Sequence, residues 1–205
     1  MTARLVAVLA PIGAQPPAGV DAADYRRALL EDTYEVLAGL ELVDVALAVD
    51  PTYQDAARSL AWPGTRILPV PDEPAQPRTR ATLEAMVALG AESVAVVAGD
   101  APDLPGLLVG KLFRALSPAD AAVCPAADGG LVALATKVPP AAWLPDIDLD
   151  DVDALDRLRA AAPRRHAVGL APGWHRLRTP VDVHRLDPGL EGWEMTRALL
   201  SGAAR

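Results

Sequence analysis

The stretch SVAVVAGDAPDLPG, residues 93–106, decides the fold that we predict, because it joins an apolar run to two carboxylates. Residues 93–98 are nearly all apolar, as in a buried strand, and Asp100 and Asp103 follow on either side of a proline. Parallel sheets of α/β proteins bind their ligands beyond the carboxyl ends of the strands. The sequence therefore predicts a ligand site directly after residue 98.

The segments before this stretch alternate between predicted strands and predicted helices. Apolar runs predict strands at 4–10, 43–49, 66–70 and 94–98, and helical spacing predicts helices between them: one after residue 21, one at 52–60 and one at 78–89. Strands that are apolar on both faces are typical of a mostly parallel sheet that helices cover on both sides. We therefore predict an α/β fold with three layers, similar to a Rossmann domain.

The second half of the chain predicts a mixed sheet. A helix with Leu104, Leu108, Leu112 and Leu116 on its inner face precedes strands at 121–124 and 131–135. The connection between these two strands is too short for a crossover helix, so at least one of them is expected to run antiparallel. The acidic stretch at 146–161 predicts a capped helix, and 191–200 predicts a last helix. No linker divides the chain, so residues 1–205 are expected to form one domain.

Composition excludes several classes of function. The chain has 205 residues, 51% of them hydrophobic, which suffices for a substantial core. A net charge of -8 argues against nucleic acid as a partner, since such proteins usually carry a basic face. The single cysteine, Cys124, excludes an internal disulfide and predicts a cytoplasmic protein with an inert core thiol. No apolar run is long enough to span a membrane.

Asp100 and Asp103 form the first candidate site. Carboxylates at the mouth of a sheet can bind Mg²⁺ or Mn²⁺, which neutralises the phosphates of a nucleotide. The alternative is structural: Asp103 caps the next helix and Asp100 forms a turn before Pro102.

The second candidate is the triplet Asp128, Gly129 and Gly130. Two glycines permit positive φ and a close approach of a ligand to the backbone, and the carboxylate can accept hydrogen bonds from hydroxyl groups or act as a base. The alternative is a plain hairpin turn, for which Asp-Gly is a strong signal.

Together the two stretches resemble the DUF2064 family of glycosyltransferase-like proteins, which have the GT-A nucleotide-diphospho-sugar transferase fold. The family's patterns G-(T/S)-D-x-P-x-L and G-P-x-x-D-G-G-Y are matched here by Gly99, Asp100, Pro102, Leu104, Pro125, Asp128, Gly129 and Gly130. The resemblance implies that Asp100 contacts a metal ion and the diphosphate of a nucleotide-sugar or NTP. Gly99 is a further candidate for the nucleotide contact, and Asp103 for both the metal and the nucleotide. The resemblance also implies that Asp128 and the glycines line the donor or acceptor pocket.

The chain departs from the family pattern at three places, one of which is Leu131, where the family usually has an aromatic residue after the glycines. The first loop, residues 11–20, is normally basic in the family but carries no Lys or Arg here, and the acids of the family's D-V-D-T-P segment are replaced by Arg176 and Arg178. An arginine would repel a metal ion at this position. Either an arginine clamps phosphate in place of the metal, or catalysis is lost and the protein is a binding or interaction module, a pseudoenzyme.

For the enzyme we expect transfer of a sugar or nucleotidyl group to a small acceptor. Asp128 would position or deprotonate the acceptor, and Arg178 or Arg176 would stabilise the leaving phosphate.

The remaining candidates are weaker. Arg78 and Arg80 are expected to lie in a solvated first helical turn, and the alternative is that they reach an anionic ligand across the sheet edge. His166 and His184 are expected at the surface, whereas His175 beside Trp174 is of more interest. An exposed Trp193 with Leu199 and Leu200 would suit a homodimer contact, and packing against the chain's own core is the alternative.

Overall fold

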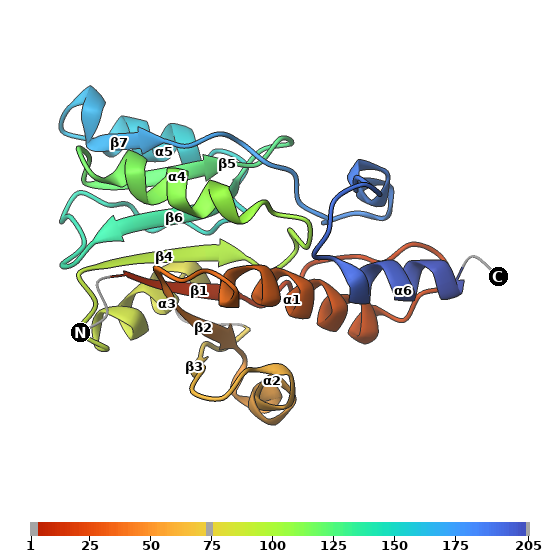
Figure 1. Ribbon diagram of the computed structural model, residues 1–205. Helices are drawn as coiled ribbons and strands as arrows, with labels where there is room; N and C mark the ends of the chain where they lie inside the picture. The colour runs from red at the N-terminus through yellow and green to blue at the C-terminus, as the bar shows by residue number, and fades with distance from the viewer. Residues whose placement is uncertain (1–3, 73–75, 204–205) are drawn as a thin grey trace.

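Seven strands form one sheet in the order β3-β2-β1-β4-β6-β5-β7 in the computed structural model, which describes residues 4–72 and 76–203 (Figure 1). The strands are β1 (Arg4–Leu9), β2 (Asp44–Val49), β3 (Arg66–Pro69), β4 (Ser93–Ala98), β5 (Ala121–Pro125), β6 (Leu131–Lys137) and β7 (Val168–Leu170). The α-helices are α1 (Ala22–Ala38), α2 (Gln54–Leu60), α3 (Arg78–Val87), α4 (Gly106–Leu116), α5 (Ala154–Ala161) and α6 (Glu194–Ala203).

The sheet is mixed, as the sequence predicts. β1 pairs in parallel with β2 and β4, and β2 pairs in parallel with β3. β6 runs antiparallel to both β4 and β5. This confirms the antiparallel strand that the short connection between β5 and β6 predicts. β7 then pairs in parallel with β5 at the edge. The carboxyl ends of β1, β2, β3 and β4 therefore point to the same side of the molecule.

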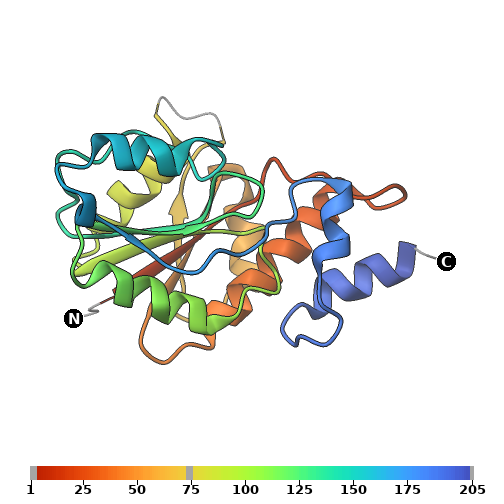
Figure 2. The same ribbon diagram turned by 90° about the horizontal axis from the view of Figure 1, so that it is seen from above.

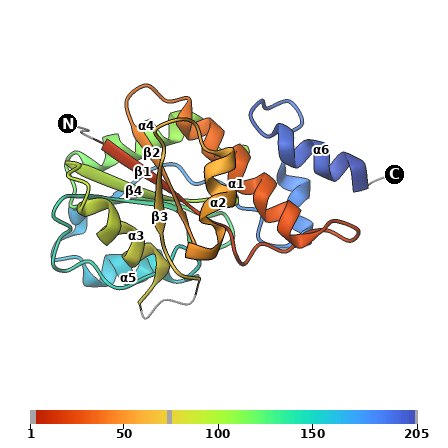
Figure 3. The ribbon, with the colours of Figure 1, turned by 90° about the horizontal axis from the view of Figure 1, so that it is seen from below.

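The core lies on both faces of the sheet. Along β1, Val6 and Val8 pack into one apolar cluster together with α1 and α4, whereas Leu5 and Leu9 pack into a second cluster together with α3 and α5. Figure 2 and Figure 3 show the same division, with α1 and α4 on one face and α3 and α5 on the other. The strands are apolar throughout because side chains alternate between two buried faces.

The acidic stretch at 146–161 differs from the prediction. α5 begins only at Ala154, and the predicted helix is wrong for residues 146–153. Ile147 and Leu149 are both 2% exposed and belong to the core cluster of α3 and α5. They alternate with acidic residues at a period of two, which is the spacing of extended chain and not of a helix. The breaker-rich loop predicted after β3 includes residues 73–75, which lie outside the described residues.

The last helix packs against the chain itself. Trp193 is 6% exposed and lies in a third cluster with Tyr25, Leu29 and Leu177. Of the two alternatives for Trp193, the structure shows packing against the chain's own core and not an exposed indole. Figure 1 shows α6 beside α1, at the end of the molecule far from α5. Among the described residues, no helix combines the length and the apolar character that a membrane span requires.

A carboxylate on α1 anchors the start of α6. Asp32 accepts hydrogen bonds from the backbone N–H groups of Met195 at 3.0 Å and Thr196 at 2.7 Å. Desolvation by burial raises the pKa of Asp32 to about 6, although these hydrogen bonds oppose the shift.

The raised pKa of Asp32 predicts a pH-dependent stability. The folded protein binds this proton more tightly than the unfolded chain, in which the pKa of Asp is about 4, so the free energy of unfolding falls as pH rises from about 4 to about 6. We expect wild type to lose stability relative to Asp32→Asn over that range in urea denaturation. A difference between the two proteins that does not vary with pH would contradict this assignment.

Candidate functional site

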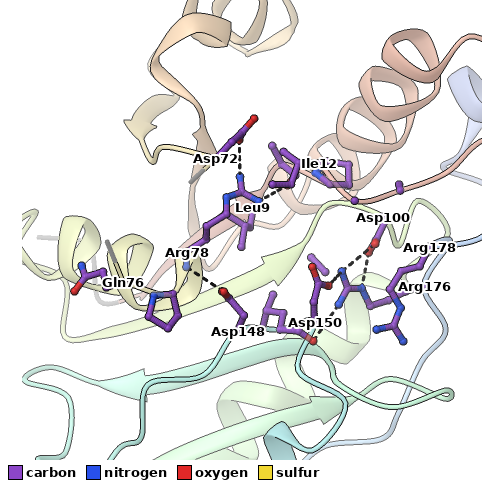
Figure 4. A pocket seen from close by; sticks show the side chains of 17 residues that line it. Leu9, Ile12, Asp72, Gln76, Arg78, Asp100, Asp148, Asp150, Arg176 and Arg178 are labelled. Carbon is purple, nitrogen blue, oxygen red and sulfur yellow. Dashed lines mark hydrogen bonds and ion pairs between the residues drawn. The ribbon is translucent and has the colours of Figure 1, made fainter. Parts of the chain in front are cut away.

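A cavity of about 560 Å³ opens at the carboxyl ends of β1 and β4. Its walls come from the loop after β1 (residues 9–14), the start of α3 (76–78), the end of β4 (98 and 100), the acidic stretch (148–150), Arg176 and Arg178. Figure 4 shows these side chains around the opening. The position is the one at which parallel α/β sheets bind ligands. A site at the end of β4 therefore follows from both the sequence pattern and the geometry.

A buried ion pair forms the floor of this region. Arg176 donates from Nε to Asp100 Oδ1 at 2.6 Å and from Nη2 to Asp100 Oδ2 at 2.9 Å. Asp100 is 1% exposed and Arg176 is 4% exposed. Two parallel bonds between a guanidinium and a carboxylate are among the strongest hydrogen bonds in proteins. Both oxygens of the predicted metal ligand are therefore used by an arginine.

The remaining donors of Arg176 are also used. Nη2 lies 2.6 Å from Asp150 Oδ1, and Nη1 donates to the carbonyl oxygens of Leu131 and Leu149, both at 3.1 Å. Burial by itself lowers the pKa of Arg176, but the charges and hydrogen bonds of Asp100 and Asp150 outweigh it and raise that pKa above its usual range. A guanidinium has five N–H donors, and here each one has an acceptor. A phosphate could bind Arg176 only by displacing one of them.

Asp148 positions the first turn of α3. Its Oδ1 accepts from the backbone N–H of Thr79 at 2.8 Å and from the Thr79 hydroxyl at 3.0 Å, and its Oδ2 accepts from the backbone N–H of Arg78 at 3.3 Å. Thr79 Oγ1 in turn accepts from the N–H of Leu149 at 3.1 Å. The start of α3 is thereby attached to the extended stretch 146–150.

Arg78 is buried at the cavity, contrary to the solvated position that the sequence predicts. It is 8% exposed and donates from Nη1 to the carbonyl of Ala10 at 3.0 Å, while Nη2 lies 3.5 Å from Asp72. Among residues 4–72 and 76–203, neither Nε nor Nη2 of this buried guanidinium has a hydrogen-bond acceptor. Desolvation lowers the pKa of Arg78, and nearby carboxylates, with Asp72 the strongest, oppose that shift. Arg78 is therefore a desolvated cation at the cavity wall, and nearby carboxylates offset its charge.

Arg178 connects the second predicted motif to the cavity. Its Nη2 lies 2.9 Å from Asp128 Oδ1 and donates to the carbonyl of Gly129 at 2.7 Å. Gly129 and Gly130 adopt φ of 95° and 75°, and a Cβ on Gly130 would lie 2.5 Å from the carbonyl of Leu149. Two glycines are needed at this turn for both reasons. Arg178 lines the cavity, and its partner Asp128 does not.

The other two predicted contacts differ in their surroundings. At Gly99 a Cβ would lie 2.8 Å from the carbonyl of Leu9, so this glycine is required where β4 leaves β1. Asp103 points away from the cavity. Its Oδ1 accepts from Trp174 Nε1 at 3.1 Å, and its Oδ2 lies 3.0 Å from His175 Nε2. The Trp174 and His175 rings stack at 4.9 Å and line a separate open hollow.

The carboxylates assigned to a divalent cation do not fit one in this arrangement. Both oxygens of Asp100 accept from Arg176, and those of Asp103 face Trp174 and His175. Within residues 4–72 and 76–203, no group of three or more His, Cys, Asp or Glu side chains is placed to hold a metal ion. The ligand contacts expected at Gly99, Gly129 and Gly130, and the catalytic role expected of Asp128, stay predictions.

The sequence analysis did not single out Asp72, which lines the cavity, and it placed Arg78 at the surface. It also missed the two cavity acids Asp148 and Asp150. The signal for the two acids was the alternation DIDLD at 146–150, in which apolar and acidic residues exchange at a period of two. Arg78 gave no such signal, because the sequence around it fits an exposed helix start equally well. The remaining expectations for single residues agree with the structure: His166 and His184 are exposed, and Cys124 is buried.

The fold is that of nucleotide-diphospho-sugar transferases and nucleotidyltransferases. A protein of Desulfovibrio desulfuricans, proposed to be a nucleotide-diphospho-sugar transferase, gives a TM-score of 0.66 at 20% identity over 98% of this chain and 96% of that one. CMP:2-keto-3-deoxy-manno-octonic acid synthetase, solved with CTP, gives a TM-score of 0.61 at 14% identity, over 97% of this chain and 98% of that one. The Rv0371c protein of Mycobacterium tuberculosis, solved with manganese, gives 0.51 at 20% identity over 98% of each chain.

The family follows from the sequence itself. Residues 18–150 match DUF2064, a family described as uncharacterized proteins conserved in bacteria, and the chain belongs to this family. The resemblance inferred from Asp100 and Asp128 is thereby confirmed. No curated protein matches the chain.

The ion pair of the cavity floor predicts unequal costs for two similar substitutions. Asp100→Asn removes the negative charge that faces the buried guanidinium of Arg176. This loss should lower the free energy of unfolding by about 3 kcal/mol or more. Asp128→Asn breaks the more exposed pair with Arg178 and should cost about 1 kcal/mol or less. Urea denaturation of the two variants checks this order, and equal losses would contradict it.

Proposed function

We propose that the protein binds a nucleoside di- or triphosphate, as an NTP or as part of a nucleotide-sugar, in the cavity at the ends of β1 and β4. We propose further that it transfers the nucleotidyl or glycosyl group to a small acceptor. The observation that carries the proposal is Arg78, a buried cation at the wall of this cavity, whose Nε and Nη2 have no hydrogen-bond acceptor in the described part of the chain.

The positive charge that would bind phosphate in this cavity comes from arginines outside the first loop. Residues 10–14 line the cavity but contain no Lys or Arg. Arg78, at the start of α3, is desolvated and only partly compensated by Asp72 and the carbonyl of Ala10. A phosphate oxygen at Nε or Nη2 would satisfy these donors with charge-assisted hydrogen bonds. The gain in binding free energy is larger than at a solvated arginine, because the desolvation of Arg78 has already occurred in folding.

Two further residues extend the proposal from binding to transfer. Arg178 lines the same cavity and would stabilise negative charge on the leaving phosphate. Asp128 is held by Arg178 at 2.9 Å and would orient the acceptor or take its proton. A cavity of about 560 Å³ is within the usual range for a small-molecule site. The likeness to folds of nucleotide transferases supports this class of ligand.

Loss of Arg78 should weaken nucleotide binding. Arg78→Met removes the unused donors and should weaken the affinity about 10-fold or more, the value of one or two charge-assisted hydrogen bonds. The measurement is calorimetric titration with the ligand that stabilises wild type most in a thermal-shift panel of UDP-, GDP-, ADP- and dTDP-sugars and NTPs. Arg78→Lys should retain part of the affinity, because lysine keeps the positive charge but lacks the paired N–H donors of the guanidinium.

Arg80 provides the matched control. It lies on the same helix, pairs with Glu84 at 2.8 Å and with Asp146 at 3.5 Å, and is absent from the cavity wall. Arg80→Met should bind the ligand as wild type does. Circular dichroism and the melting temperature without ligand show whether Arg78→Met remains folded. A folded Arg78→Met with unchanged affinity would overturn the role of Arg78, and a panel without any stabilising ligand would overturn the proposed function.

A further inference from the structure

Five oxygen atoms surround the guanidinium of Arg176. They are both carboxylate oxygens of Asp100, one of Asp150, and the carbonyl oxygens of Leu131 and Leu149, all between 2.6 and 3.1 Å from a nitrogen. Carboxylate and carbonyl oxygens are also the ligands that hard divalent cations prefer. We propose that Arg176 is a built-in cation that occupies this oxygen cluster in place of a metal ion, so that the cavity binds its ligand without divalent metal.

The geometry makes the arginine a permanent part of the site. Figure 4 shows Arg176 between Asp100 and Asp150, with its guanidinium directed at both. Every N–H donor has an oxygen acceptor, and the side chain is 5% exposed. A metal ion could reach the oxygens only if the guanidinium left, and a departing guanidinium would have to give up all five partners. Two cations cannot share the cluster, because their repulsion at such distances is strong.

The arrangement also assigns Arg176 a role other than phosphate binding. Its donors face protein oxygens, whereas Nε and Nη2 of Arg78, which are also buried, have no hydrogen-bond acceptor among the described residues. Arg176 is thus a positioning residue: it neutralises Asp100 and fixes Asp150 and Leu149 in the cavity wall. Without a cation here, the carboxylates of Asp100 and Asp150 would repel both each other and an incoming phosphate.

Charge balance indicates how the proposal can be tested. Arg176→Asp changes the charge at this position from +1 to -1, and one divalent cation restores the two missing positive charges. The variant would also supply a further carboxylate beside those of Asp100 and Asp150, which gives three acidic ligands in one oxygen-rich cluster. The variant with one bound divalent cation therefore has the same total charge at this cluster as wild type.

The first experiment measures Mn²⁺ binding without nucleotide. Protein stripped with EDTA and dialysed is titrated with Mn²⁺, and the signal of free Mn²⁺ is followed by electron paramagnetic resonance. We expect no stoichiometric binding by wild type, and binding of one Mn²⁺ by Arg176→Asp, with a melting temperature that rises when Mn²⁺ is added. Arg66→Asp, on the exposed edge strand β3, has the same change of charge and should behave as wild type. Stoichiometric binding by wild type, or none by folded Arg176→Asp, overturns the proposal.

The second experiment keeps the proposal testable if Arg176→Asp does not fold. It rests on the proposed function, since it uses the nucleotide identified in the thermal-shift panel. Wild type should be stabilised by this nucleotide to the same extent in EDTA and in Mn²⁺. Stabilisation that disappears in EDTA and returns with Mn²⁺ overturns the inference. If no nucleotide stabilises the protein at all, the proposed function fails, while the Mn²⁺ titration of wild type still decides the role of Arg176.

Discussion

The ion pair between Asp100 and Arg176 is the interaction on which the candidate site depends. It joins the end of β4 to a segment 76 residues further along the chain, and the same guanidinium binds the carbonyls of Leu131 and Leu149. A buried guanidinium is stable only when its donors find acceptors, and removal of one partner is costly. The start of β6, the stretch 146–150 and the segment around Arg176 are therefore restricted to one relative arrangement, and the cavity has a defined wall.

The distribution of charge explains how an acidic protein can offer a site for an anion. The chain has a net charge of -8, yet three arginines line one cavity, together with four aspartates, Asp72, Asp100, Asp148 and Asp150. Arg176 is fully paired with oxygen atoms, Arg178 is shared with Asp128 and Gly129, and Arg78 has two donors without an acceptor among the described residues. These three states correspond to the three roles proposed here: a structural cation, a residue for the leaving phosphate, and a binding residue. Side chains of one type thus differ in chemistry because their acceptors differ.

Much of the fold and part of the site were predictable from local pattern. Apolar runs and helical spacing predicted β1 to β4 and their helices, and the short connection predicted the antiparallel reversal between β5 and β6. Asp100 was placed correctly at the end of β4. The stretch 146–153 was not, because its acids favour a helix start on composition while Ile147 and Leu149 follow the spacing of extended chain. Burial of these two side chains against α3 and α5 decided between the alternatives.

The sequence by itself determined the layered α/β architecture, the family and the edge of the sheet at which a ligand would bind, since these depend on periodicity and on short motifs. Only the tertiary structure decided which charges meet there. Asp100 and Asp103 are three residues apart yet face different partners, and Arg78 is buried although its neighbour Arg80 is partly exposed. The partner of a charged side chain is set by contacts between segments far apart in the chain, and local sequence carries no record of such contacts.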